Sequence, residues 1–249
     1  MKNSYSNIFS FNKKILKKSI QNLNNSDILG LPTETVYGLG GNAYSKKSIQ
    51  KIYKLKGRPK SNPLIIHYLN LKDASKDVVI NEKLKKLYKN FCPGPITFVL
   101  KKKFGSKINP LASAKLRTIA IRFPKHKIIR SILKKIDFPL AMPSANKSSN
   151  ASPVTAEDVF DEFKQKIKLI INGGKCKIGI ESTVIDLTNA PNILRPGIIS
   201  KTLIEKILNK KIKKKINKKE LRSPGLMKKH YSPGIPVLLN QKKHDGKSA

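Results

Sequence analysis

The sequence predicts an α/β fold, a sheet covered by helices, on three observations. Short apolar segments alternate along the chain with longer segments whose apolar residues recur at helical spacing. Loops rich in Gly and Pro separate the two kinds of segment. With 249 residues, 39% of them hydrophobic, the chain is long enough to bury one large core. We therefore expect one large domain with its functional residues in the loops at the strand ends.

Six segments have the apolar spacing of amphipathic helices. Ser45 is expected to cap the second of them, and that helix must end near Gly57 and Pro59, because proline disfavours helical geometry in the residue before it. Thr155 and Asp158 have the spacing of a capping box at the start of the fifth helix. The expected helices cover residues 12–23, 45–57, 84–91, 128–136, 155–163 and 201–220.

Six shorter apolar segments are expected to be strands, at residues 28–31, 64–68, 96–100, 118–123, 169–171 and 183–187. The segment 32–42 is expected to be a loop, because it contains Gly38, Gly40 and Gly41. Residues 221–236 hold three Pro and two Gly without periodicity, which predicts an extended linker. Residues 236–239 resemble the opening of a further strand.

The chain is strongly basic, with a net charge of +37 from 46 Lys, 6 Arg and 15 acidic residues. Such a charge suits a polyanionic partner such as nucleic acid. However, the excess of Lys, Asn and Ile is typical of an AT-rich genome. We therefore favour the interpretation that most lysines are simply solvated.

Cysteine content and apolar run length exclude several classes of protein. Cys92 and Cys176 are isolated, without the spacing of a zinc site or a disulfide framework. No apolar segment has the length of a signal peptide core or of a membrane helix. We therefore expect a cytoplasmic protein that does not bind membranes.

The loops hold four of the six arginines: Arg58, Arg117, Arg122 and Arg195. In a chain so rich in Lys, an Arg indicates a position where a planar bidentate cation matters, and phosphate and carboxylate are its usual ligands. Lys56 and Arg58 share one short loop, where they repel each other unless an anion lies between them.

Other catalytic patterns are absent from the sequence. No phosphate-binding GxxxxGK[ST] motif or complete dinucleotide fingerprint is present. Ser144 and Ser182 lack a GxSxG context, so each either binds a ligand or caps a turn. Glu34 and Glu181 are the only acids in these loops and do not form the acid pair of a glycosidase. His67 follows an apolar segment, where an ordinary core histidine is the alternative.

Seven segments in order, PTETVYGLG, KGRP…NPL, PGPIT, IAIRFP, PSAN, GIESTV and ILRPG, make the chain resemble the YrdC-like family of threonylcarbamoyl-AMP synthases. The tail resembles the linker of the longer, two-domain members. The resemblance implies a twisted, mixed, open sheet around a deep basic cavity. It implies a catalytic domain at residues 9–209, a Lys-rich helix end and linker or lid at 210–236, and at 237–249 the first part of a second domain that is otherwise missing.

The implied reaction is a nucleotidyl transfer. L-Threonine, bicarbonate or CO2, and ATP with Mg2+ would give threonylcarbamoyl-AMP and pyrophosphate. Separate transferase proteins would then modify tRNA next to the anticodon, and weak binding of tRNA itself is compatible with the charge. The alternative is a non-catalytic, basic RNA-binding module of the same fold. A related carbamoyl-transfer enzyme of hydrogenase maturation is disfavoured, because the Cys-rich zinc modules it needs are absent.

The resemblance also assigns site residues. Lys56 and Arg58 are the expected catalytic residues, and Tyr231 is the expected lid over the nucleotide. No protein side chain is expected to bind a metal, because phosphate oxygens hold Mg2+. The expected ATP-binding residues are Lys56, Arg58, Asn62, Thr118, Ser144, Ser152, Arg195 and Tyr231, and the expected threonine-binding residues are Thr35, His67, Arg122, Met142 and Ser182.

Overall fold

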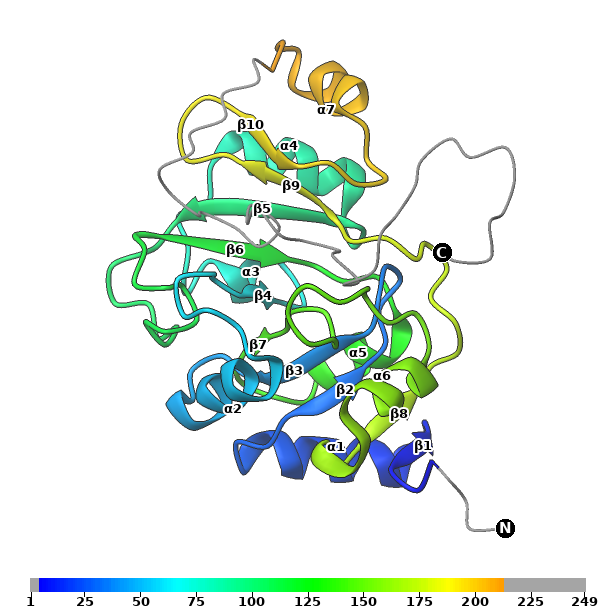
Figure 1. Ribbon diagram of the computed structural model, residues 1–249. Coiled ribbons are helices and arrows are strands. Elements are labelled where there is room, and N and C mark those ends of the chain that lie inside the picture. Colours follow the sequence, from blue (N-terminus) through cyan, green and yellow to red (C-terminus); the bar gives the residue numbers. More distant parts are fainter. Residues whose placement is uncertain (1–4, 213–249) are drawn as a thin grey trace, which may run out of the picture.

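A computed structural model describes residues 5–212, which form one mixed sheet of ten strands flanked by helices (Figure 1). The strand order is β1-β8-β2-β3-β7-β4-β6-β5-β9-β10, with β1 and β10 at the two edges. The predicted α/β class is therefore confirmed. The strands are β1 (Ile8–Ser10), β2 (Leu29–Leu31), β3 (Gly38–Asn42), β4 (Ile65–His67), β5 (Ile96–Lys101), β6 (Thr118–Arg122), β7 (Leu140–Ala141), β8 (Ile170–Asn172), β9 (Thr183–Asp186) and β10 (Asn192–Arg195).

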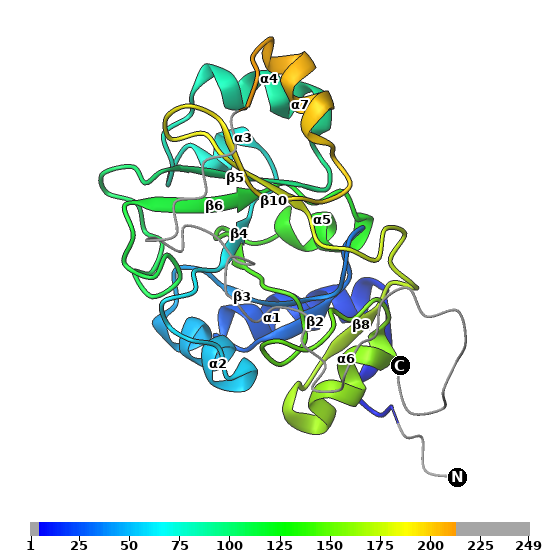
Figure 2. The same cartoon turned by 45° about the horizontal axis from the view of Figure 1, so that its top comes forward.

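The described residues also form seven α-helices and one short 3-10 helix, and α7 follows the last strand. Helices α4 and α7 pack against each other beside the β9–β10 edge, as both views show (Figures 1 and 2). No helix of residues 5–212 is long and apolar enough to cross a bilayer. The helices are α1 (Lys13–Asn24), α2 (Lys46–Lys56), α3 (Leu71–Ala74), α4 (Glu82–Phe91), α5 (Lys127–Leu133), α6 (Ala156–Phe163), the 3-10 turn Lys164–Lys166 and α7 (Lys201–Leu208).

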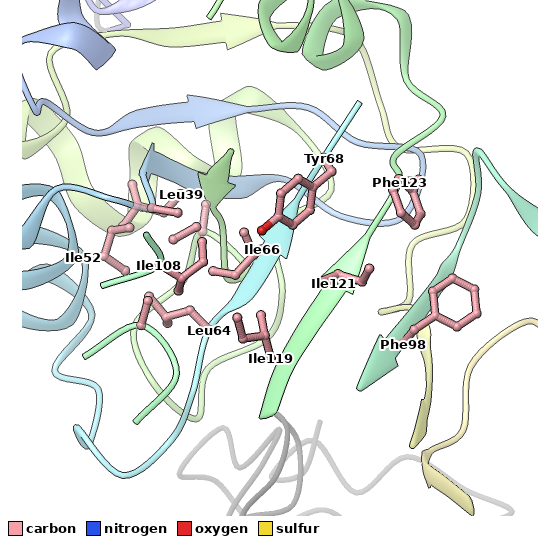
Figure 3. Close-up of a cluster of buried hydrophobic side chains, with 14 of the residues drawn as sticks. Leu39, Ile52, Leu64, Ile66, Tyr68, Phe98, Ile108, Ile119, Ile121 and Phe123 are labelled. Atoms are coloured by element: carbon pink, nitrogen blue, oxygen red, sulfur yellow. The ribbon is translucent and has the colours of Figure 1, made fainter. Parts of the chain in front are cut away.

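The two faces of the central strands differ, because successive side chains of a strand point to opposite faces. Ile66, Phe98 and Ile121 lie on one face, inside the main hydrophobic core (Figure 3). His67 and Arg122 each follow one of these residues directly and are partners in the parallel register of β4 and β6. The alternation therefore places the core on one face of the sheet and these two polar side chains on the other.

Helix ends are set by local side-chain chemistry, largely as predicted. The Ser45 hydroxyl accepts a hydrogen bond from the Ser48 N–H (3.2 Å), and α2 ends at Gly57, whose φ is +58°. The predicted capping box is confirmed, because Thr155 Oγ1 accepts from the Asp158 N–H (3.1 Å) and Asp158 Oδ2 accepts from the Thr155 N–H (2.9 Å).

The prediction of a loop throughout 32–42 is wrong, because Gly38–Asn42 form strand β3 between β2 and β7. A Cβ at Gly38 would lie 2.4 Å from Met142 Cγ, and one at Gly40 would lie 2.7 Å from Leu31 Cδ1. These glycines therefore mark strand backbone that large side chains cover closely, and not a turn.

The prediction of a helix over 201–220 is also wrong in its extent. Helix α7 ends at Leu208, and Asn209 adopts the left-handed conformation (φ +48°) that terminates a helix. The Glu205 carboxylate then accepts the Ile212 N–H (2.6 Å) and turns the chain away from the helix axis. The remainder of the predicted linker and the predicted strand at 236–239 lie outside the described residues.

Candidate active site

The first wall of the site is formed by strand ends that meet on the polar face of the sheet. His67 ends β4, Arg122 ends β6, and Ser182 directly precedes β9. Thr97 of β5 pairs with Arg122, and its hydroxyl lies 2.7 Å from Ser182 Oγ. β5 runs antiparallel to β6 and parallel to β9. The last residues of β6 and the first residues of β9 therefore both lie beside the start of β5.

The second wall is made by two segments distant in the sequence, 33–38 and 142–146. The Leu39 N–H donates to Pro143 O (2.9 Å) and the Ala145 N–H donates to Tyr37 O (2.9 Å). The close approach of Met142 to Gly38 described above lets these segments lie against each other. The loops that the sequence marks by their Gly, Pro, Ser and Thr content thus form one structure.

An open pocket lies between these walls, with about 500 Å³ of empty space that includes the solvent at its mouth. It brings together three of the six arginines and most of the residues expected around threonine. The lining residues are Thr33, Val36, Tyr37, Gly38, Arg58, Ile65, His67, Arg122, Met142, Pro143, Ser144, Glu181, Ser182 and Arg195.

Arg58 is held by the loop that follows α2. Its Nε donates to Asn62 O (3.0 Å), and its Nη2 donates to Asn62 Oδ1 (2.6 Å) and to Pro63 O (2.9 Å). Burial lowers the pKa of Arg58 to about 10, so the guanidinium keeps its charge at neutral pH. Asn62 therefore fixes the orientation of a cation that lines the pocket.

Lys56 does not line the pocket. Its side chain is buried, and Nζ donates to Ser144 O (2.5 Å) and to Asn146 O, while Lys56 O accepts the Ser148 N–H (2.9 Å). Burial, assisted by the charge of Arg58, lowers the pKa of Lys56 to about 7. The amine ties the 144–148 segment to the end of α2 and so holds Ser144 at the pocket wall.

Arg122 and Glu34 form an ion pair buried behind the pocket. Arg122 Nη2 lies 2.6 Å from Glu34 Oε1, and only 5% and 9% of the two side chains are exposed. Glu34 Oε2 also accepts the Lys125 N–H (2.9 Å). Burial alone would raise the pKa of Glu34, but the charge and hydrogen bond of Arg122 outweigh it and hold that pKa below its usual value.

Arg195 is held by the backbone and side chains that precede β9. Its Nε and Nη2 donate to Ser182 O (3.1 and 2.9 Å), its Nη2 donates to Ser182 Oγ (3.2 Å), and its Nη1 pairs with Glu181. Glu181 also accepts a hydrogen bond from the Ser152 hydroxyl (3.1 Å). Three guanidinium groups line the pocket, and two carboxylates, those of Glu34 and Glu181, pair with two of them. The net charge of these five groups is therefore positive.

His67 Nδ1 and Arg122 Nε are buried without a hydrogen-bond partner among the described residues. Burial and the charge of Arg122 lower the pKa of His67 to about 3, so the imidazole is neutral at physiological pH. Buried polar atoms are normally paired. Two unpaired polar atoms on neighbouring strands of the pocket therefore point to a polar ligand between them.

The structure brings together seven of the expected site residues as pocket lining: Arg58, His67, Arg122, Met142, Ser144, Ser182 and Arg195. Three others contact this lining: Lys56 and Asn62 as described, and Ser152 through Glu181. Thr35 is fully buried, with its hydroxyl 2.9 Å from that of Thr33. Thr118 lies four residues before Arg122 on the same face of β6 and is not part of the lining. Tyr231 lies outside the described residues.

Sequence reasoning did not assign Thr33, Tyr37, Glu34 or Glu181 to the site. Of the two threonines in PTET, the sequence does not say which one faces the pocket. Glu34 and Glu181 lie in PTETVYGLG and GIESTV, segments without an arginine, so the sequence did not reveal that they pair with Arg122 and Arg195.

Comparisons with known proteins agree with this architecture. A model of the Sua5/YciO/YrdC family, described as "Telomere recombination", matches residues 21–197, and a model described as "Threonylcarbamoyl-AMP synthase, C-terminal domain" matches residues 199–249. The threonylcarbamoyl-AMP synthase of Pyrococcus abyssi is 39% identical over 85% of this chain and 64% of its own length. The Bacillus subtilis enzyme of the same name is 37% identical over 87% of this chain and 64% of its own length. The chain thus spans 64% of the length of each of these curated relatives, which is less than two thirds.

Solved structures of proteins named Sua5 and YciO have a similar fold. The crystal structure of P. abyssi Sua5 complexed with L-threonine has a TM-score of 0.86 and 36% identity, and the match covers 92% of this chain and 70% of that one. Escherichia coli YciO shares the fold with a TM-score of 0.70 at 21% identity, over 79% of this chain and 98% of that one.

Proposed function

The chain belongs to the Sua5/YciO/YrdC family, and we propose that it is an L-threonylcarbamoyladenylate synthase. The proposed substrates are L-threonine, bicarbonate or CO2, and ATP with its Mg2+, and the products are threonylcarbamoyl-AMP and pyrophosphate. Separate transferase proteins would pass the threonylcarbamoyl group to tRNA. The observation that carries the proposal is the convergence of Arg58, Arg122 and Arg195 on one pocket.

The chemistry requires two anions to meet. The threonine amine attacks bicarbonate, giving a carbamate and releasing water. A carbamate oxygen then attacks the α-phosphate of ATP, the new P–O bond forms, and the bond to pyrophosphate breaks. Two unit charges 4 Å apart repel by about 4 kcal/mol near a protein surface. Fixed guanidinium groups remove this barrier without a nucleophilic side chain.

On the threonine side, we assign Arg122 to the α-carboxylate of the substrate. Its Nε is free for a ligand, and the neighbouring His67 Nδ1 is available for a second hydrogen bond. Met142 and Ser182 would complete this end of the pocket, with Thr35 acting through Thr33. Because His67 is neutral, we assign it a binding role and no proton transfer.

On the nucleotide side, we assign Arg58, Ser144 and Arg195 to direct contacts with ATP. Lys56, Asn62 and Ser152 would support these contacts from behind. Thr118 lies on the same face of β6 as Arg122, so an extended nucleotide along that strand would reach it. Tyr231 keeps its proposed role as a lid, and residues 210–236 and 237–249 keep their proposed roles as linker and start of a second domain.

The deciding experiment incubates the protein with ATP, Mg2+, labelled bicarbonate and one amino acid at a time. We expect a labelled adenylate with L-threonine. Arg58→Ala should abolish it while the melting temperature stays near that of the wild type, and Arg58→Lys should not restore it, because Lys lacks the bidentate fork. Arg130→Ala is the matched control, since Arg130 donates to Leu69 O and Pro124 O away from the pocket lining.

A non-catalytic RNA-binding module gives a different pattern. Such a protein binds tRNA but forms no labelled adenylate with any amino acid. Full turnover by Arg58→Ala would also remove Arg58 from the proposed mechanism.

A further inference from the structure

The loop between β5 and β6 presents a fully exposed aromatic side chain. The relative exposure of Phe104 is 103%, about twice that of the next most exposed large apolar side chains among residues 5–212, Ile198 (53%) and Ile180 (52%). This loop lies at the left edge of both views (Figures 1 and 2). A single exposed apolar residue is ordinary on a protein surface. Phe104 differs from such residues in the loop that holds it.

The loop is anchored on both sides of Phe104 by Asp77, whose side chain is buried. Asp77 O accepts the Lys103 N–H (2.9 Å), and Asp77 Oδ1 accepts the Ser106 hydroxyl (2.8 Å) and the Lys107 N–H (3.0 Å). Hydrogen bonds therefore hold the residue directly before Phe104 and the second and third residues after it.

The anchor is itself fixed, because Asp77 Oδ2 accepts from the hydroxyls of Tyr44 (2.8 Å) and Tyr68 (3.0 Å). Gly105 adopts a positive φ of +76°, which turns the chain at the tip. Phe104 is thus held out into solvent by a constrained loop and does not reach the core.

The surroundings of Phe104 are cationic. Residues 101–117 contain six Lys and Arg residues and no acid, and the carboxylate that contacts this segment, that of Asp77, is buried. The Lys102 N–H donates to Arg117 O (2.8 Å), so the start of β6 lies beside the loop. The exposed basic residues of the two segments are Lys101, Lys103, Lys107, Lys115 and Arg117.

We propose that this surface, residues 101–107 with Lys115 and Arg117, binds unpaired nucleotides by stacking a base on Phe104 and pairing the flanking phosphates with the basic side chains. Single-stranded nucleic acids offer that combination of a flat aromatic face and regularly spaced anions. A lipid surface is less suitable, because one Phe supplies little of the apolar area that membrane binding requires.

The proposed surface is separate from the pocket. Thr118 and Arg122 mark the two ends of β6, about 13 Å apart at ~3.3 Å per residue. The proposal rests on none of the residues that line the pocket, so it does not depend on the enzymatic function.

The absence of tryptophan from the chain allows a direct test. Phe104→Trp places the only indole on the loop, and stacking of a base quenches its fluorescence. The probes are a uridine oligonucleotide and a thymidine oligonucleotide of equal length, at low and at physiological salt. Leu203→Trp is the matched control, since Leu203 is an exposed apolar residue (43%) beside lysines on helix α7, which packs against α4.

We expect both oligonucleotides to quench Phe104→Trp and to leave Leu203→Trp unchanged; stronger quenching by uridine would assign RNA. Phe104→Ala and Phe104→Leu should both weaken binding about 5- to 150-fold, the range for losing one stacked base. Lys107→Gln should reduce the salt dependence of binding by about 0.7 in log–log slope.

Three results would overturn the proposal. If Phe104→Ala and Phe104→Leu bind as tightly as the wild type, only charge holds the oligonucleotide. Equal quenching of the two indole variants would show binding spread over the whole basic surface. A response of Phe104→Trp to anionic vesicles but to neither oligonucleotide would assign the loop to membranes instead.

Discussion

The buried pair of Arg122 and Glu34 makes a quantitative prediction for Glu34→Gln. The substitution keeps the shape of the side chain and removes its charge, which leaves the Arg122 guanidinium uncompensated at 4% exposure of the whole residue. Breaking a buried ion pair by removing one partner costs about 3–5 kcal/mol. For a protein of this size, that loss lowers the melting temperature by about 6–20 °C.

The assay is thermal unfolding of the substrate-free protein followed by circular dichroism. Glu82→Gln is the matched control, because Glu82 pairs with Lys85 at 2.7 Å with 77% and 56% of the side chains exposed. That exposed pair contributes less than about 1 kcal/mol, so Glu82→Gln should barely change the melting temperature. The double variant Glu34→Gln/Arg122→Met should recover part of the stability, because it leaves no buried charge without a partner.

A loss below about 1 kcal/mol for Glu34→Gln would refute the reasoning, since that is the value expected for a pair in contact with water. A double variant less stable than either single variant would refute it as well, because the damage would then come from packing and not from charge.

Three further predictions concern single residues. The pKa of Lys56 is about 7 in the folded protein and 10.5 in the unfolded chain, so the unfolded state binds more protons between these pH values. The free energy of unfolding should therefore rise by up to about 2 kcal/mol from pH 7 to 9. Urea unfolding of Lys56→Met should lack this rise, and an equal rise in the variant would contradict the assignment to Lys56. The pKa of His67, about 3, predicts that its imidazole NMR shifts stay constant from pH 5 to 8, and a titration in that range would disprove its burial. A Cβ at Gly197 would lie 2.4 Å from the Thr183 backbone nitrogen, so Gly197→Ala should cost roughly 1–3 kcal/mol in denaturant unfolding and displace Ser182; unchanged stability would show that this turn adapts.

The elements that could be predicted are those with strong local signals. Helix α6 has a capping box and a regular apolar face, so the sequence determines both its existence and its start. Strand β3 could not be predicted, because its glycines are required by Met142 and Leu31, residues that tertiary structure brings to it. Strand β7 has two residues and exists only through pairing with β3 and β4, so it leaves no periodic signal.

The candidate site was predictable to the extent that residue type reports chemistry. Arginines in a lysine-rich chain marked Arg58, Arg117, Arg122 and Arg195. The structure places three of them at one pocket, whereas Arg117 is exposed just before β6 and does not line it. The direction in which a side chain points could not be predicted from residue type. Lys56 precedes Arg58 by two residues, yet its amine turns toward backbone carbonyls, because the last turn of α2 directs it to the 144–146 segment.

The pairing of β1 with β8 has a consequence for synthesis on the ribosome. Ile8 pairs with Ile170, and the pocket draws on residues from Thr33 to Arg195. A nascent chain therefore exposes β1, and the side of β2 that pairs with β8, until β8 has been made, and the pocket is incomplete until β10 supplies Arg195. We expect such a chain to fold slowly, only after its last strands have been synthesised, and to depend on chaperones until then.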